Sequence, residues 1–269
     1  MTPVVAHLET LRDLLRQGGA APLRRRLLAN RARVATLAGR LAFFDLRDPL
    51  SARGYYNLAL ESAREAGDHL QAAAALAHVA FIPAADNGFG AALDYIRAAA
   101  QHAAKRPDGR VASWLYAVES EIQTNAGSYA AALAAIDRAL ETLAKPGLTA
   151  DLPWLDYYDT TRLSGFAGYA MLRAGRFEES RSALTSALDR LPRNAVKQRA
   201  VFLADIASVE LACGDLDQAC ATAGDAAEQL RQAGYAIGFG RLQDFRSAVR
   251  PWSSSTPVRA LDEQLAALG

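Results

Sequence analysis

The sequence lacks most of the features that mark secreted, membrane-spanning or nucleic-acid-binding proteins. Its only cysteines are Cys213 and Cys220, too few for a disulfide framework, which favours a reducing cytoplasm. No basic segment followed by an apolar run opens the chain, and no run of about 18 apolar residues occurs, so we expect neither export nor a membrane span. A formal net charge of +1 excludes a global field that would attract nucleic acid.

Motifs for catalysis and metal binding are also missing. The sequence contains no HExxH, no GxSxG and no phosphate-binding loop. Its four histidines fall in separate predicted helices without the spacing of metal ligands: His7, His69, His78 and His102. Asp156 and Asp159 would be neighbours on a helix, but Arg162 follows three residues later, so we interpret the acids as solvated or paired. We therefore predict no enzyme, no metal and no cofactor.

What the sequence does contain is a repeated pattern of small residues, clearest in "RAGRFEESRSALTSALDRLPRN" from Arg173 to Asn194. Aligning other segments on the small residue of this stretch gives five copies: Ala52, Ala92, Ala132, Ser180 and Ala219. Seven residues later, every copy has an alanine: Ala59, Ala99, Ala139, Ala187 and Ala226. Small residues allow two helix backbones to approach closely, and the spacing resembles the tetratricopeptide repeat, a pair of antiparallel helices.

This resemblance implies an all-α fold, a right-handed superhelical solenoid of about five tetratricopeptide-type helix pairs with helical caps at both ends. The expected repeats are residues 33–66, 73–106, 113–146, 161–194 and 200–233. We expect N-terminal capping helices in 1–32 and C-terminal capping helices in 234–269. Because one helix pair cannot bury its apolar face alone, the stack is the folding unit.

Three segments fit the repeat less well. The first copy has Arg40 where a small residue is expected. Between the third and fourth copies, "KPGLTADLPWLDYYD" is an insertion, and we predict that it lengthens the first helix of the fourth repeat from Pro153. The glycine-rich stretch 234–241 has no lysine and no preceding strand, so we interpret it as a bend between helices.

In such a stack the first helix of each pair lines a concave groove, and residues three and four apart point into it. Aromatic residues beside arginine, glutamate and amide groups suit a peptide or a small aromatic or anionic ligand. For the aromatic members, packing between helices is the competing interpretation. The predicted binding residues are His78, Phe81, Trp114, Glu121, Asn125, Tyr158, Arg162, Phe166, Tyr169, Arg173, Gln198 and Asp205.

A second candidate surface is basic, because Arg26, Arg33, Arg40 and Arg47 recur every seven residues. On one helix they would form a contact ridge for DNA phosphates or for an acidic partner. A solvated helix face is the competing interpretation.

Longer segments such as "SWLYAVESEI" and "PWLDYYDTTRLSGFAGYAMLRAGRFEE" resemble the repeat region of actinobacterial helix-turn-helix transcriptional regulators. The resemblance implies a sensor or dimerisation region that follows a DNA-binding domain. Here Met1 precedes the repeats almost directly, so we expect no direct nucleic-acid binding. The sequence predicts a cytoplasmic regulator or sensor, able to form a homodimer, whose groove binds a peptide, a small-molecule signal or a protein. The alternative is a constitutive protein–protein interaction scaffold.

Overall fold

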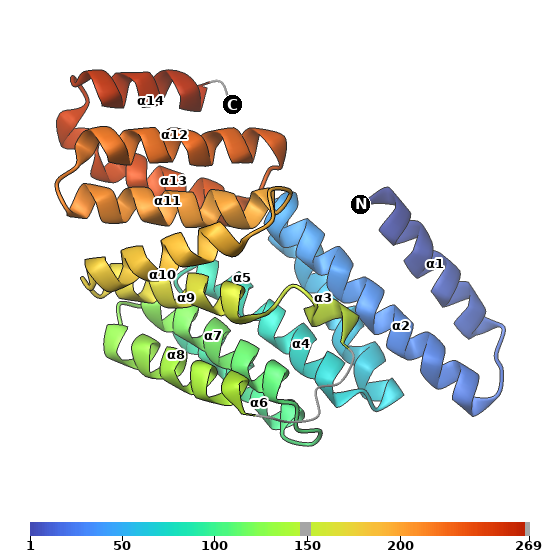
Figure 1. Cartoon of the computed structure of the whole chain (residues 1–269). Helices are drawn as coiled ribbons and strands as arrows, with labels where there is room; N and C mark the ends of the chain where they lie inside the picture. The colour runs from blue at the N-terminus through green and yellow to red at the C-terminus, as the bar shows by residue number, and fades with distance from the viewer. Residues whose placement is uncertain (146–151, 267–269) are drawn as a thin grey trace. The chain divides into compact units, whose positions relative to one another are not determined.

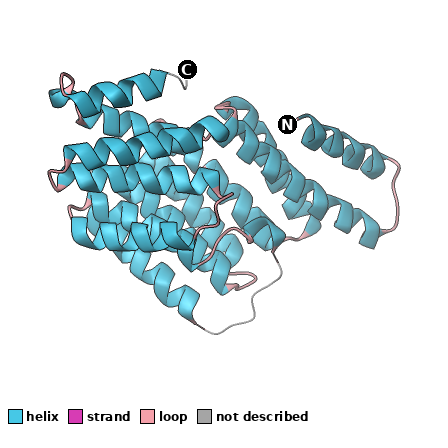
Figure 2. Ribbon diagram, turned by 45° about the horizontal axis from the view of Figure 1, so that its top comes forward, coloured by secondary structure: helices cyan, strands magenta, loops and turns pink. Residues whose placement is uncertain are grey.

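The computed structural model describes residues 1–145 and 152–266, and every regular element in these ranges is a helix (Figures 1 and 2). The predicted all-α fold class is thereby confirmed. The chain divides into two compact units, Met1–Tyr158 and Asp159–Gly269. In the part of the chain that the structure describes, no helix is long and apolar enough to cross a membrane.

The first unit is built from helices that pack in antiparallel pairs (Figure 1). Within it, α2 packs against α3, α4 against α6, and α7 against α8. The elements are α1 (Thr2–Arg16), α2 (Ala21–Arg40), the π-helical turn η1 (Leu41–Asp45), α3 (Pro49–Ala66), α4 (His69–Val79), α5 (Phe81–Ala85), α6 (Phe89–Ala103), α7 (Gly109–Asn125), α8 (Tyr129–Ala144) and the 3-10 turn η2 (Pro153–Leu155).

The second unit continues the same alternation. Its elements are α9 (Thr160–Arg173), α10 (Phe177–Arg190), α11 (Val196–Ala212), α12 (Leu216–Gln232), α13 (Ala236–Ala248), the 3-10 turn η3 (Arg250–Trp252) and α14 (Thr256–Ala266). Helices α9 and α10 form one pair and α11 and α12 the next. Because α13 packs on α11 and α14 packs on α12, the last two helices extend the stack of this unit as a further layer.

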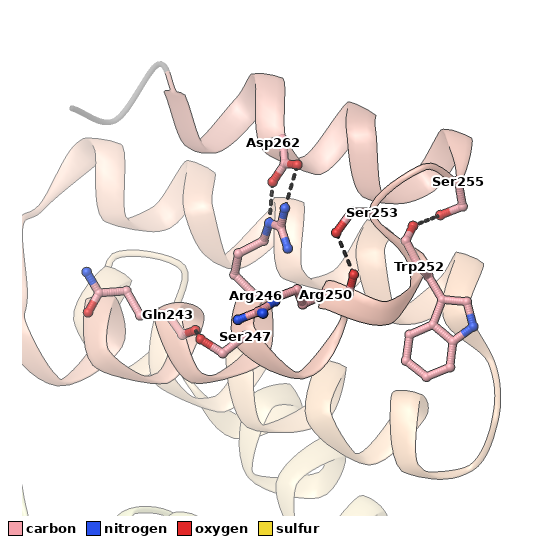
Figure 3. A network of polar contacts seen from close by, with 8 residues as sticks. All are labelled: Gln243, Arg246, Ser247, Arg250, Trp252, Ser253, Ser255 and Asp262. Carbon is pink, nitrogen blue, oxygen red and sulfur yellow. Dashed lines mark hydrogen bonds and ion pairs between the residues drawn. The ribbon is translucent and has the colours of Figure 1, made fainter.

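Figure 3 shows how α13 and α14 are joined. The guanidinium of Arg246 donates hydrogen bonds to both carboxylate oxygens of Asp262, the second from Nη2 to Oδ2 at 2.8 Å. In the connection between the helices, the hydroxyls of Ser253 and Ser255 donate to the carbonyls of Arg250 and Trp252. Local hydrogen bonds therefore hold the turn between α13 and α14, and one ion pair links the two helices.

Aspartates mark the starts of several helices. A side-chain oxygen of the residue before the helix accepts a hydrogen bond from a backbone N–H in the first turn, which satisfies a donor that has no partner within the helix. This cap is present at Asp48 for α3, Asp68 for α4, Asp108 for α7, Asp159 for α9 and Asp215 for α12. The boundaries of these helices are thus set by local sequence.

The small residues of the repeat are the closest points of helix contact. All ten of the aligned positions, from Ala52 to Ala226, have no exposed surface. Between α9 and α10, a Cβ added to Gly168 would lie 2.4 Å from Cγ of Leu184, and Ser180 Oγ donates to the Gly168 carbonyl at 2.7 Å. The residues therefore act through packing, as the repeat pattern predicts.

The first repeat differs in register from its predicted alignment. Helix α2 is continuous from Ala21 to Arg40, so no helix break falls between residues 32 and 33, and the division into caps and repeats stays a prediction. The small residue is Gly39, not Arg40, since a Cβ on Gly39 would lie 2.4 Å from Cε1 of Tyr56. The π-helical turn that follows α2 accommodates one more residue than an α-helical turn, which explains the shift by one.

Two further predictions about helices are wrong. The first helix of the fourth repeat does not begin at Pro153, because only η2 forms there and α9 begins at Thr160, where Asp159 caps it. Residues 146–151 of the insertion lie outside the described residues. The stretch 234–241 is not a bend, since most of it forms the first turns of α13. Gly238 permits this helix to pack closely, as a Cβ there would lie 2.8 Å from Cδ2 of Leu230.

Candidate functional site

The predicted binding residues divide equally between the two units. The first unit contains His78, Phe81, Trp114, Glu121, Asn125 and Tyr158. The second unit contains Arg162, Phe166, Tyr169, Arg173, Gln198 and Asp205. Within each unit, burial separates residues that a ligand can reach from residues that belong to the core.

One face of α9 in the second unit presents cationic and aromatic side chains. Arg162, Phe166, Tyr169 and Arg173 recur at spacings of four, three and four residues, which places them on one side of the helix. The guanidinium carbon of Arg162 lies 5.4 Å from the ring centre of Phe166, and both residues are half-buried. Arg173, in the last turn, is exposed. We name Arg162, Phe166 and Arg173 the α9 face.

A hydrogen-bond donor on the α9 face has no partner among the described residues. The Nε–H of Arg162 is buried and makes no hydrogen bond to any described residue. Buried donors in folded proteins are nearly always paired, because an unpaired one loses its hydrogen bond to water. An acceptor oxygen from a ligand would satisfy this group. Gln198, in the first turn of α11, is half-buried and adds an amide to the same unit.

The other two predicted residues of the second unit are covered by Arg241 of α13. Its guanidinium carbon lies 3.0 Å from the ring centre of Tyr169, and its Nε lies 3.4 Å from Oδ1 of Asp205. Tyr169 and Asp205 are 5% and 2% exposed. Burial is the main cause that raises the pKa of Tyr169. A ligand could contact these two residues only if it displaced Arg241, and their role in binding stays a prediction.

Arg241 was missed at the level of sequence because the stretch 234–241 was interpreted as a bend. A helix there places Arg241 one residue before the buried Leu242, on a helix that packs on α11. The unmatched acid on α11 was the available signal: a buried aspartate such as Asp205 needs a cationic partner. We name Tyr169, Asp205 and Arg241 the Arg241 cluster.

In the first unit, His78 is the middle of an aromatic stack. Its ring centre lies 5.7 Å from that of Tyr56 and 5.2 Å from that of Trp114. The Nδ1–H donates to the carbonyl of Ala74 at 2.7 Å. Burial, followed by the nearby charge of Arg40, lowers the pKa of His78 to about 3. His78 and Trp114, 3% and 2% exposed, are therefore packed between helices in the core, which is the competing interpretation for the aromatic residues.

Tyr158 is also a core residue. Ser113 Oγ lies 2.8 Å from the carbonyl of Ala139 and 2.8 Å from the hydroxyl of Tyr158. Since Ser113 has a single hydroxyl proton and gives it to the carbonyl, Tyr158 is the donor of the second bond. Tyr158 precedes α9 instead of lying on it, and it fastens the segment after η2 to α7. Tyr158 is 1% exposed because α9 starts after it, and its role in binding stays a prediction.

The remaining predicted residues of the first unit are at least partly accessible. Phe81, in α5, is half-buried and contacts Phe44 edge to face, with ring centres 5.4 Å apart. Glu121 is half-buried and Asn125 is exposed, one turn apart near the end of α7. These three residues stay candidates for binding.

The four arginines predicted to form a basic ridge do not lie on one helix. Arg26, Arg33 and Arg40 belong to α2, whereas Arg47 follows η1 and has a left-handed backbone with φ of 55°. The guanidinium carbon of Arg40 lies 4.6 Å from the ring centre of Tyr157, so this cation packs on an aromatic face. A ridge along one helix is excluded because the π-helical turn ends the helix before Arg47, and contact of these arginines with a partner stays a prediction.

The structure also places the residues considered for chemistry. Asp159 accepts a hydrogen bond from the backbone N–H of Arg162, and Asp156 lies before the helix, so the two acids are not helical neighbours. No cluster of three or more histidine, cysteine or acidic side chains suited to a metal ion occurs in residues 1–145 and 152–266. His69 and His102 lie in separate helices, α4 and α6, with their Nδ1 atoms 3.4 Å apart.

No family model matches the chain, and neither does any curated protein. Among solved structures, the chain is similar to the apo form of the quorum sensor NprR from B. thuringiensis, with 13% identity over 97% of this chain and 74% of the other and a TM-score of 0.56. It is also similar to a tetratricopeptide repeat protein from Parabacteroides merdae, with 15% identity, coverage of 98% and 92%, and a TM-score of 0.51. At these identities the likeness shows a fold alone, the all-α tetratricopeptide-like helical repeat.

Proposed function

We propose that the chain is a non-enzymatic binding protein that holds a peptide, or a peptide segment of a protein partner, on the α9 face. The observation that carries the proposal is the unpaired, buried Nε–H of Arg162 beside the half-buried ring of Phe166. A peptide offers a carbonyl or carboxylate oxygen for the guanidinium and apolar surface for the ring. Arg173 extends the same face with an exposed cation.

A regulatory role is the second part of the proposal. The apo form of NprR, to which the chain is similar in fold, is called a quorum sensor, which supports a sensor. The resemblance to the repeat region of helix-turn-helix regulators supports a link to transcription. In this chain the α9 face lies on the same helix as Tyr169, which contacts Arg241 of α13. A ligand on α9 would therefore act on the helix that also carries Tyr169 of the Arg241 cluster.

The test begins with selection of peptides from a random library displayed on phage, using the full chain as bait. Selected peptides are then measured by calorimetry against the wild type and two variants, Phe166→Ala and Arg173→Gln. We expect each variant to weaken binding about tenfold. Phe166→Ala removes the apolar contact of the ring, and Arg173→Gln removes a charge-assisted hydrogen bond. Arg193→Gln, an exposed arginine between α10 and α11, is the matched control and should bind as the wild type does.

Circular dichroism spectra and melting temperatures of the variants establish that they are folded. If the selected peptides bind the wild type, both variants and the control with equal affinity, the α9 face is not the binding surface. If the wild type selects no peptide from several libraries, peptide binding itself is contradicted.

A further inference from the structure

The first unit, which does not include the α9 face, contains an open pocket of about 570 Å³. It lies where the first turns of α2, the end of α3 with the turn after it, and the chain after α6 come together. Four arginine side chains line it, and we name the site the arginine pocket after them: Arg25, Arg26, Arg64 and Arg106. The predicted basic ridge contains only Arg26 of these residues.

The four cations of the arginine pocket are available to a ligand. All four residues are exposed, and none of them forms an ion pair with a side chain in the described ranges. They come from three different segments that are far apart in sequence, so their charges converge on one depression instead of following a line. Convergent guanidinium groups recognise compact anions, because each offers paired N–H donors that match phosphate or carboxylate oxygens.

Two carboxylates also line the pocket, and both have other partners. Glu65 accepts a hydrogen bond from Arg24, which lies outside the pocket lining. Asp68 caps α4, with its Oδ1 3.1 Å from the backbone nitrogen of Gln71. Neither carboxylate forms an ion pair with the arginine pocket, which therefore keeps an excess of positive charge.

His102 lies near the positive charge of Arg64 and next to a second histidine, His69. The Nδ1 atoms of His69 and His102 lie 3.4 Å apart. Burial is the first cause that lowers the pKa of His102, and the charges of Arg64, Lys105 and His69 lower it further. The neutral form of His102 is thus favoured beside these cations.

We propose that the arginine pocket binds a compact anion with two or more linked phosphate groups, as in an oligophosphate or the phosphate chain of a nucleotide. Several guanidinium groups converging on one place require a ligand with several charges at short distances, and linked phosphates have them. The volume lies within the range of about 300 to 1,000 Å³ that small-molecule sites occupy. The pocket shares no residue with the α9 face, so anion binding here can be tested independently of peptide binding there.

Inorganic tripolyphosphate is the first probe, titrated into the full chain by calorimetry at about 50 mM salt, where electrostatic binding is strong. We expect Arg64→Gln and Arg106→Gln each to weaken its binding about tenfold, because each removes a charge-assisted contact. Arg53→Gln is the matched control, since Arg53 is an exposed arginine on the same helix as Arg64 and does not line the pocket. It should leave the affinity unchanged.

Glu65→Gln tests the sign of the effect. It removes a negative charge from the wall and leaves Arg24 without its partner, so tripolyphosphate should bind several-fold more tightly. A variant that is merely damaged would not gain affinity. In proton NMR titrations of the wild type, bound tripolyphosphate should raise the pKa of His102, because the anion offsets the charges of Arg64 and Lys105.

Two comparisons identify the ligand class. ATP that binds more tightly than tripolyphosphate indicates a nucleotide, and equal affinity indicates the phosphate chain alone; both agree with the proposal. Citrate of similar charge that binds as well as tripolyphosphate overturns the preference for phosphate. The proposal is also overturned if tripolyphosphate does not bind, if Arg53→Gln weakens it as much as Arg64→Gln, or if only duplex DNA binds, which would indicate a nucleic-acid surface.

Discussion

Replacing Gly168 by alanine tests directly whether the repeats pack through their small residues. The added Cβ would lie 2.4 Å from Cγ, 2.7 Å from Cδ2 and 3.3 Å from Cδ1 of Leu184. Carbon atoms in favourable contact are about 3.5 to 4.0 Å apart. Leu184 has no exposed surface, so its side chain cannot turn into solvent, and either α9 or α10 must shift.

The expected cost follows from two opposing effects. Overpacking a core costs about 1 to 3 kcal/mol, whereas alanine in a helix gains up to about 1 kcal/mol over glycine. Because three carbons of Leu184 would be too close, the overpacking cost should lie near the upper end of this range. After the gain from helix propensity is subtracted, we expect Gly168→Ala to lower the free energy of unfolding by about 2 kcal/mol. Gly240→Ala is the control, because nothing lies within 4 Å of a Cβ added at that position in α13. It should stabilise the protein by up to about 1 kcal/mol.

Urea unfolding followed by circular dichroism measures both changes. A double-mutant cycle with Leu184→Ala assigns the loss to this contact. Alone, Leu184→Ala should cost about 2 to 5 kcal/mol by leaving a cavity. Combined with Gly168→Ala, it should cost less than the sum by about 1 kcal/mol or more, since the new methyl group enters the cavity. The packing argument is refuted if Gly168→Ala stabilises the protein as Gly240→Ala does, or if the two changes add.

Three further outcomes can be checked in the same way. Removing one partner of the buried Asp205–Arg241 pair, as in Arg241→Met, should cost about 3 to 5 kcal/mol in urea unfolding, and a cost below about 1 kcal/mol would contradict it. Arg246→Ala breaks the more exposed pair with Asp262 and should cost only about 1 kcal/mol or less, measured identically. His78 takes up a proton near pH 6.5 in the unfolded chain but only near pH 3 in the folded chain. The free energy of unfolding should therefore fall by about 2 kcal/mol between pH 7.5 and pH 5. His78→Phe should lack this part of the loss, and equal losses in both proteins would refute the reasoning.

The repeat was predictable because its determinants are local. Ala187 follows Ser180 by seven residues, two turns of one helix, and this spacing repeats wherever two helices approach closely. Helix starts depend on equally local determinants, such as the carboxylates of Asp108 and Asp215, which cap the next turn. Errors arose at Gly39 and Pro153, where a π-helical turn and a short 3-10 turn changed the count of residues along the chain.

The predicted binding face was only partly readable, because helical spacing states which side of a helix a residue occupies and not what covers that side. Phe166 and Tyr169 are both aromatic and lie on the same side of α9. Phe166 nevertheless stays half-buried, whereas Tyr169 is covered by Arg241. His78 and Trp114 similarly became core residues when the helices that carry them packed together.

The sequence by itself determined the helices, their caps and the small residues at which they meet, since each of these depends on atoms within a few turns. Only the tertiary structure decided which polar and aromatic residues remain accessible. Arg241 reaches Asp205 and Tyr169, and Arg64 reaches the same pocket as Arg25 and Arg106, through packing between helices that are distant along the chain. Such contacts depend on how side chains fill the space between helices, and periodicity within one helix does not contain that information.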